Sequence, residues 1–198
     1  MMNDLVRRTR TIRRFDEGKN IDPAVLDVLL DLARLGGSAR NAQVLKYMAI
    51  TEEALRRQLF PLLGWAGYLS DWPGPGPGER PSVYIVCLLD TNLLRGPETE
   101  AHFDLGIASQ NLLLGAAEHG LFGCRIGAFS PSRVHKLLRL ENRLKVLLVM
   151  ALGYPAEQVV LEEVGPDGDI RYWHDDQGRH HVPKRSLAEI LVKPPVAE

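Results

Sequence analysis

Apolar and polar positions alternate along the chain in a way that predicts helices and strands of ordinary length. Asp22-Pro23 precedes a run with apolar residues at helical spacing and Gly36-Gly37 follows it, which predicts a helix with Asp22 as its N-cap. The apolar run at residues 47–50 predicts a buried strand, and Thr51 is expected to cap a second helix that ends near Leu59.

The longest predicted helix covers residues 98–118 and lies between two strongly apolar runs. Residues 82–89 and 144–153 are predicted to form buried strands on either side of it. The helix itself is apolar almost all round, from Phe103 to Ala117, which is typical of an element at the centre of a core or at a dimer interface.

Two further segments have distinctive turn residues. Residues 71–81 are rich in Pro and Gly, so they predict a surface loop or a lid. A phosphate-binding loop is disfavoured there, because proline lacks the backbone N–H that such a loop needs. Residues 170–182 alternate around the turn at residues 175–178 and predict a hairpin.

Length, composition and charge narrow the class of protein. A chain of 198 residues is most simply one domain, residues 1–198, and 45% hydrophobic with 25% charged residues is ordinary for a globular protein. A net charge of −1 argues against nucleic-acid partners and acidic membranes. No apolar run approaches the roughly 20 residues of a membrane helix, and no secretory signal is visible, so a cytoplasmic protein is expected.

An arginine-rich segment near the N-terminus has the chemistry of a phosphate site. Arg10 and Arg13 flank the hydroxyl of Thr11, and guanidinium groups match phosphate oxygens with two parallel donors. A solvated surface or a nucleic-acid arm is the alternative interpretation. Lys184 and Arg185 form a second basic pair near the C-terminal end of the sequence.

A polar loop follows the first predicted helix. Ser38, Asn41 and Gln43 offer a hydroxyl and two amides, and an amide carries both donors and an acceptor, as the edge of a heteroaromatic ring requires. A loop stabilised by its own side chains is the alternative. With the arginines, the loop indicates a phosphorylated heterocycle as ligand.

Metal and hydrolase chemistry are not indicated. His180 and His181 are adjacent, so in a strand they face opposite sides, and the other histidines show no defensible ligand spacing. Cys87 and Cys124 lack a Cys-x-x-Cys spacing, which argues against a disulfide framework or a zinc site. No Gly-x-Ser-x-Gly turn is present.

Six segments in sequence order together resemble the nitroreductase family of FMN-dependent oxidoreductases. They are the arginine segment at 10–15, the Ser-x-x-Asn-x-Gln loop at 38–43, the helix at 104–114, the Gly-rich segment at 120–127, Ala-Leu-Gly-Tyr-Pro at 151–155 and Val-Pro-Lys-Arg-Ser-Leu at 182–187. One departure from the family pattern is Val44-Leu45 after Gln43, where members often have Pro-Trp.

The resemblance implies an α+β homodimer, with a mixed or antiparallel sheet flanked by helices and FMN in the interface. The residues that would contact FMN are Arg10, Thr11, Arg13, Ser38, Asn41, Gln43, Cys124, Arg125, Ile126, Gly127, Lys184 and Arg185. Flavin N5 would take a hydride from NADH or NADPH and pass electrons to a small nitroaromatic or quinone-like acceptor in a ping-pong cycle, without a catalytic side chain. Two alternatives remain open, namely an FMN storage or sensor protein, and a specialised dehalogenase, dehydrogenase or flavin-fragmenting enzyme of the same fold.

Overall fold

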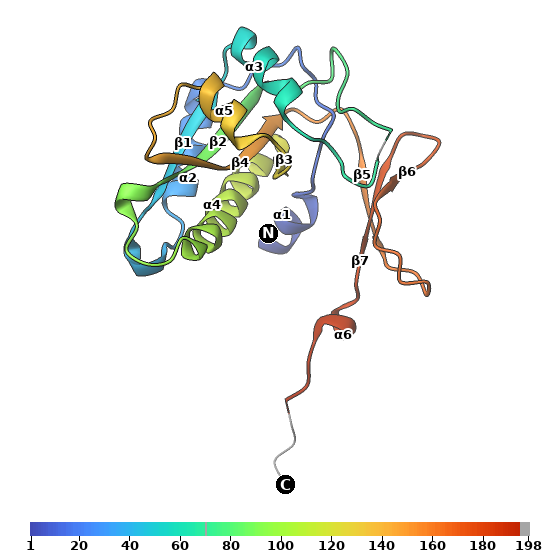
Figure 1. Cartoon of the computed structure of the whole chain (residues 1–198). Helices are drawn as coiled ribbons and strands as arrows, with labels where there is room; N and C mark the ends of the chain where they lie inside the picture. Colours follow the sequence, from blue (N-terminus) through green and yellow to red (C-terminus); the bar gives the residue numbers. More distant parts are fainter. Residues whose placement is uncertain (70, 195–198) are drawn as a thin grey trace.

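A four-stranded antiparallel sheet forms the centre of the computed structural model, which describes residues 1–69 and 71–194 (Figure 1). Its strands are β1 (Leu45–Ile50), β2 (Val83–Asp90), β4 (Leu144–Gly153) and β3 (Phe122–Ile126), in that spatial order. A second sheet contains β5 (Val159–Glu163), β7 (His180–Lys184) and β6 (Trp173–His174), with β5 parallel and β6 antiparallel to β7. Figure 1 shows this smaller sheet beside the main body, with the chain after β7 extending away from it.

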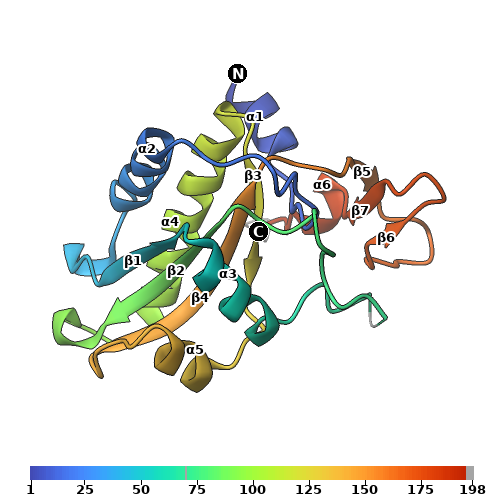
Figure 2. The ribbon, with the colours of Figure 1, turned by 90° about the horizontal axis from the view of Figure 1, so that it is seen from above.

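Helices cover both faces of the main sheet (Figure 2). Helices α2 (Pro23–Arg34) and α4 (Thr99–Glu118) cover one face, and α3 (Glu53–Leu59) and α5 (Pro131–Leu137) cover the other. The described residues also form α1 (Met2–Arg8), which contacts α4, and α6 (Leu187–Ile190), which follows β7 away from the main sheet. Short 3₁₀ turns lie at Ala39–Asn41, Phe60–Leu62 and Thr91–Leu93. Among the described residues, no helix combines the length and the apolar character needed to cross a membrane.

Alternate side chains of β2 face opposite sides of the sheet, and they belong to two separate hydrophobic cores. Val83, Ile85 and Cys87 face α2 and α4, whereas Tyr84 and Val86 face the opposite layer, which contains α3, α5 and the segment after α1. All eight residues of β2 are buried, as expected for a strand that is covered on both faces. The predicted strands at 82–89 and 144–153 are thereby confirmed.

The predicted N-cap is confirmed for the first helix and wrong for the second. Asp22 caps α2 as predicted, since its Oδ1 accepts a hydrogen bond from the backbone N–H of Ala24 at 2.9 Å. The prediction that Thr51 caps the next helix was wrong. Glu52 is the N-cap of α3, because its longer carboxylate reaches the backbone N–H of Leu55 at 3.1 Å.

Helix α4 packs against α2 and the sheet but keeps one apolar face open. Ala108, Leu112 and Ala116 are buried, whereas Phe103 is 72% exposed and Ile107 is 45% exposed. Of the two positions considered for this helix, the centre of a core does not fit the single chain, because one layer of neighbours covers only one side of the helix. The open face is the kind of surface that a second chain could bury.

Gly123 in β3 is required by a close backbone approach. A Cβ at this position would lie 2.1 Å from the carbonyl oxygen of Ala151 on β4. We expect Gly123→Ala to lower the free energy of unfolding by about 1–3 kcal/mol, the usual cost of overpacking. Urea denaturation measures this, with Gly127→Ala as the control because a Cβ at Gly127 meets nothing within 4 Å. Equal losses in the two variants would contradict the close approach.

Two neighbouring histidines on β7 face opposite environments. His181 lies between two carboxylates, with Nδ1 3.0 Å from Glu162 Oε2 and Nε2 3.2 Å from Asp175 Oδ2. Hydrogen bonds to these carboxylates raise the pKa of His181 above its ordinary value. Burial, and then the charge of Arg13, lower the pKa of His180 to about 4.

These opposite shifts predict a pH optimum for the stability of the small sheet. Stability from His181 is complete below the pKa of a free histidine, about 6.5, and is lost as pH rises through its raised folded pKa. Stability from His180 is complete above about pH 6.5 and is lost as pH falls towards its lowered folded pKa. We therefore expect stability to peak near pH 6.5, and His181→Gln to abolish the decline on the alkaline side. Urea denaturation across this range is the measurement, and an unchanged alkaline decline in His181→Gln would contradict the assignment.

Candidate functional site

The segment at residues 9–17, called here the N-terminal segment, is fixed by backbone hydrogen bonds from three directions. The N–H of Ile12 donates to Gly123 O at 3.1 Å, and the N–H of Asp16 donates to Tyr154 O at 2.9 Å. The N–H of Phe15 donates to Glu79 O at 2.9 Å, and the Phe15 ring is fully buried. The segment therefore lies in a defined path between β3, the end of β4 and the Pro/Gly loop.

The carboxylate of Glu157 adds the fourth attachment. Its Oε1 accepts hydrogen bonds from the backbone N–H groups of both Arg13 and Arg14. Its side chain is only 3% exposed, so this carboxylate is held in place by burial as well as by its partners. Two amide donors satisfy a buried negative charge that would otherwise be costly.

The side chains of the three predicted phosphate ligands, Arg10, Thr11 and Arg13, do not all face the same side of the N-terminal segment. Arg10 lines a hollow of about 420 Å³ with Ile12, Phe122 and Glu157, and Thr11 and Arg13 do not line it. Backbone around the bridge between Thr11 and Gly123 is extended, so alternate residues face opposite sides. Arg13 points instead to the small sheet, with its guanidinium 4.7 Å from the centre of the Tyr172 ring.

Both arginines of the proposed phosphate site are incompletely partnered within the described residues. The Nε of Arg10 is buried without a hydrogen-bond partner, while its Nη2 donates to Val6 O at 2.7 Å. Burial lowers the pKa of Arg10 from its usual value. Arg13 forms no ion pair there, and its Nη1 lies 3.3 Å from His180 Nε2.

Arg14, next to Arg13 in the sequence, pairs with the loop at residues 71–81. It forms an ion pair with Glu79 at 2.8 Å, and its guanidinium lies 5.4 Å from the Trp72 ring centre. The N–H of Glu17 also donates to Gly78 O at 3.2 Å. Arg14 and these bonds attach the loop at 71–81 to the N-terminal segment.

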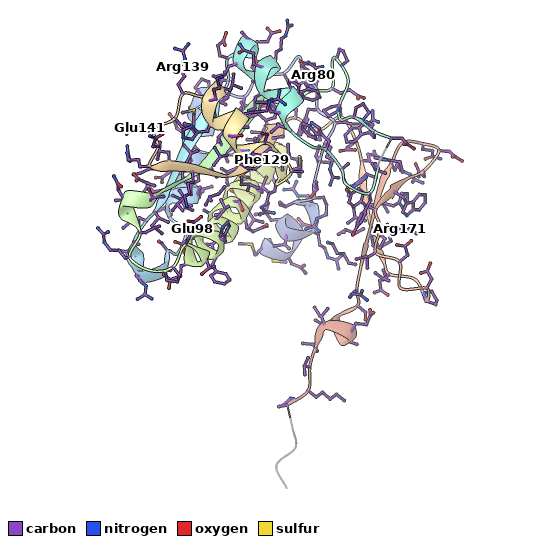
Figure 3. All side chains as sticks on the ribbon, in the orientation of Figure 1. Arg80, Glu98, Phe129, Arg139, Glu141 and Arg171 are labelled. Carbon is purple, nitrogen blue, oxygen red and sulfur yellow. The ribbon has the colours of Figure 1, made fainter. Side chains whose placement is uncertain are left out.

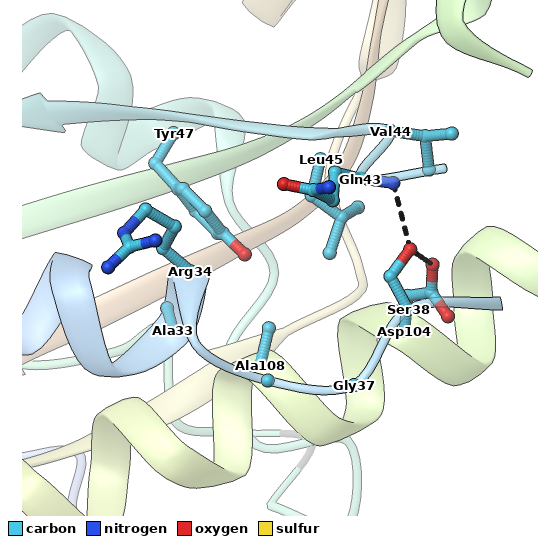
Figure 4. Close-up of a pocket in the computed structure, with 11 residues that line it drawn as sticks. Ala33, Arg34, Gly37, Ser38, Gln43, Val44, Leu45, Tyr47, Asp104 and Ala108 are labelled. Carbon is cyan, nitrogen blue, oxygen red and sulfur yellow. Dashed lines mark hydrogen bonds between the residues drawn. The ribbon is translucent and has the colours of Figure 1, made fainter. Parts of the chain in front are cut away.

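The polar loop after α2 is held by a buried acid on α4 (Figure 4). Ser38 Oγ donates to Asp104 Oδ2 at 2.7 Å, and the N–H of Ala39 donates to Asp104 Oδ1 at 2.8 Å. The N–H of Gln43 in turn donates to Ser38 Oγ at 2.9 Å. Ser38 thus serves the loop itself, in agreement with the alternative interpretation of its role.

The amides of this loop are exposed and conformationally strained. Arg40, Asn41 and Gln43 have φ values of 55°, 50° and 50°, which non-glycine residues rarely adopt. The side chains of Asn41 and Gln43 are exposed and contact each other at 3.3 Å. The adjoining pocket measures about 60 Å³, far below the roughly 300–1,000 Å³ of small-molecule sites. One chain alone therefore does not enclose a flavin at this loop.

The predicted flavin-facing residues coincide with β3 and its end. The side chains of Cys124 and Ile126 are buried in the core, and burial raises the pKa of Cys124 to about 12. Only their backbone groups could face a ligand. Arg125 binds α4, with Nε donating to Ser109 Oγ and Nη2 donating to Gln110 Oε1, both at 2.8 Å. Gly127 is exposed just after the strand.

Within the described residues, the outer edge of β3 has no paired strand beyond the bridge at Gly123. Backbone groups on such an edge are available for a ligand or another chain. The edge lies next to the N-terminal segment, so a planar ligand there would have arginines close by.

Lys184 and Arg185 lie away from Arg13 in the single chain. Arg13 contacts His180 at the start of β7, whereas Lys184 ends the strand four residues later, about 13 Å further along. Both basic residues are exposed, and Arg185 Nη1 lies 3.5 Å from Glu189 Oε1. In Figure 3 the labelled Arg171, which precedes β6, lies on the side of the molecule opposite Glu98 and Glu141.

Sequence reasoning missed Asp104 and Glu157, the two acids that fix the site segments. Asp104 lies in an otherwise apolar stretch of α4, and such an acid could have been suspected of an internal partner. Glu157 follows the end of β4 by four residues, without a comparable signal.

Comparison with known proteins agrees with this architecture. The sequence model of the nitroreductase family matches residues 77–154, a range that leaves out the N-terminal segment and the basic pair on β7. An NADPH-flavin oxidoreductase from Vibrio harveyi is 27% identical over 159 residues, which are 74% of this chain and 62% of that protein.

Solved structures show the same fold. The nitroreductase family protein from Streptococcus pneumoniae TIGR4 has a TM-score of 0.72 at 19% identity, covering 98% of this chain and 100% of that one. An FMN-dependent nitroreductase from Clostridium difficile R20291 has a TM-score of 0.66 at 18% identity, covering 80% and 89%. Residues 77–154 thus match the nitroreductase family in sequence, and the chain as a whole has the fold of solved nitroreductase family proteins.

Proposed function

We propose that this protein, acting as a single domain over residues 1–198, is a cytoplasmic FMN-dependent NAD(P)H oxidoreductase that works as a homodimer. The observation that carries the proposal is the rigidly held N-terminal segment, whose Arg10 and Arg13 lack carboxylate partners among the described residues. Such arginines suit a phosphate, whereas the adjacent Arg14 is already paired with Glu79. Relatives described as a flavin oxidoreductase and an FMN-dependent nitroreductase support the same cofactor class.

The residues near β3 fit an isoalloxazine ring beside that phosphate. The free strand edge beyond Gly123 offers backbone N–H groups, and Gly127 leaves room for close approach. Bound FMN would supply two-electron chemistry, taking a hydride from NADH or NADPH and passing electrons to a small nitroaromatic or quinone-like acceptor. The protein's own part is to hold the cofactor and exclude competing reactions, and none of its side chains needs to act as nucleophile or base.

A second chain is needed to complete this site. Arg8, just before the N-terminal segment, contacts Ala117 O at one end of α4, while Asp104 holds the Ser38 loop near the other end. Thirteen residues of helix separate these points by about 20 Å. The arginines and the loop amides of one chain are thus poorly placed to share one flavin. A partner chain packed on the exposed face of Phe103 and Ile107 could bring its own loop to the site.

The first test is the reduction of the purified protein by nicotinamide. We expect a yellow protein with about one FMN per chain, bleached by NADH or NADPH within the time of a rapid-mixing experiment. A protein that cannot be loaded with FMN would overturn the proposal. Loaded protein that no nicotinamide reduces would instead favour a storage or sensor protein, and rapid reduction with no turnover of quinones or nitroaromatics would favour a specialised enzyme.

The phosphate assignment predicts different effects on FMN affinity for substitutions of the neighbouring residues Arg13 and Arg14. Arg13→Ala should weaken FMN binding by about 1.5–3 kcal/mol, with a smaller effect at high salt. Arg14→Ala is the matched control and should leave FMN affinity nearly unchanged, because Glu79 already occupies that guanidinium. Fluorescence titration of apoprotein with FMN gives the affinities, and an Arg14→Ala loss as large as that of Arg13→Ala would show that the motif is misplaced by one residue.

The two-chain pocket predicts complementation between defective chains. An Arg13→Ala chain mixed with an Asn41→Ala chain should give heterodimers with one doubly damaged pocket and one intact pocket. About half of the wild-type activity per mixed dimer is expected. No recovery in a sample shown by mass spectrometry to contain mixed dimers would mean that each site is built within one chain.

A further inference from the structure

Two histidines and a glutamate that are distant in sequence converge beside the N-terminal segment. Glu157 follows β4, His174 ends β6 and His180 begins β7, and one potential ligand atom of each lies within 4.8 Å of the others. Sequence spacing gave no reason to group them, because only the pairing of β6 with β7 brings His174 opposite His180. From this convergence we propose that Glu157, His174 and His180 bind one divalent transition-metal ion of the zinc class.

The distances suit a metal with nitrogen and oxygen ligands. His180 Nδ1 lies 3.2 Å from His174 Nε2, and His174 Nε2 lies 3.6 Å from Glu157 Oε2. Ligands bound tetrahedrally at 2.0–2.1 Å are separated by about 3.3 Å, so small side-chain movements would complete the site. Two imidazoles and a carboxylate are a common zinc ligand set with one position left for solvent.

The surroundings hold these ligands in place. Glu157 Oε1 is occupied by the backbone N–H groups of Arg13 and Arg14, which leaves Oε2 directed at His174. His180 is 1% exposed and packs against the ring of Tyr172. His174 is partly exposed, so an ion can enter from that side.

The guanidinium of Arg13 opposes a cation here. Its Nη1 lies 3.3 Å from His180 Nε2, and in this contact Nε2 accepts a hydrogen bond. When Nδ1 binds a metal, Nε2 of the neutral ring carries the proton and no longer accepts. The guanidinium would then turn away from His180, so the contact of Arg13 with His180 and the metal exclude each other. Removal of Arg13 should consequently tighten metal binding, an effect that a purely structural histidine cluster would not produce.

The ion would connect three parts of the chain. Its ligands come from the end of the main sheet and from both strands of the hairpin, and Glu157 also holds the N-terminal segment. A metal at this point would fix the small sheet to the main body and raise the unfolding temperature. The inference does not depend on flavin binding or on turnover.

The test is titration of chelator-treated full-length protein with Co²⁺ and Zn²⁺, with visible absorption for Co²⁺ and a chromophoric chelator for Zn²⁺. We expect one ion per chain, a higher unfolding temperature with metal, and an affinity loss beyond about 100-fold in His174→Ala and Glu157→Gln. Arg13→Ala should bind more tightly than wild type. The exposed His102→Ala is the matched control and should bind like wild type.

Two results would contradict the proposed metal site. Absence of stoichiometric uptake by the wild-type protein would overturn it, and so would equal losses in His102→Ala and His174→Ala, which would mean adventitious binding at surface histidines. Circular dichroism of each metal-free variant shows whether it is folded. If Glu157→Gln unfolds, His174→Ala alone decides, since that side chain is partly exposed and its loss leaves the Glu157 bonds intact.

Discussion

The attachment of the N-terminal segment to the end of the main sheet is the constraint on which the rest of the site depends. Ile12 binds Gly123, Asp16 binds Tyr154, and the Glu157 carboxylate takes the amides of Arg13 and Arg14. Each bond is modest alone, but together they leave the segment one path. Arginine side chains on a fixed backbone lose less entropy on binding an anion, so rigidity here would contribute to the affinity for the proposed phosphate. Gly123 is a condition of this arrangement, because a side chain there would displace β4.

Helix α4 sets the spacing of the candidate site segments within one chain. It binds the polar loop through Asp104 near its start and contacts Arg8 near its end. The same helix receives Arg125 through Ser109 and Gln110, so three of the segments in the site are positioned by one element. Since a straight helix keeps its ends apart, the loop and the N-terminal segment of one chain remain separated. The exposed apolar face of α4 is the surface through which a second chain could join them.

The parts of this structure that were predictable from the sequence are those governed by local rules. Asp22 and Pro23 mark a helix start by their own chemistry, and the apolar runs of β2 and β4 identify buried strands. Bonds between distant residues were not predictable. Ser38 and Asp104 are 66 positions apart, and nothing local to Ser38 indicates that its hydroxyl is used within the loop. The grouping of Glu157 with His174 and His180 likewise depends on the register of the hairpin, which the sequence pattern alone does not specify. The positions of Arg10 and Arg13 at a phosphate remain a prediction.

The most direct measurement of the central claim is a crystal structure of the protein with its flavin bound. Our account predicts a two-fold dimer with one FMN at each of two equivalent sites. Arg13 and Thr11 of one chain should lie within hydrogen-bond distance of the phosphate, and the amides of Asn41 and Gln43 from the other chain should lie at the ring. A flavin held entirely by one chain, or a phosphate bound away from the N-terminal segment, would contradict it.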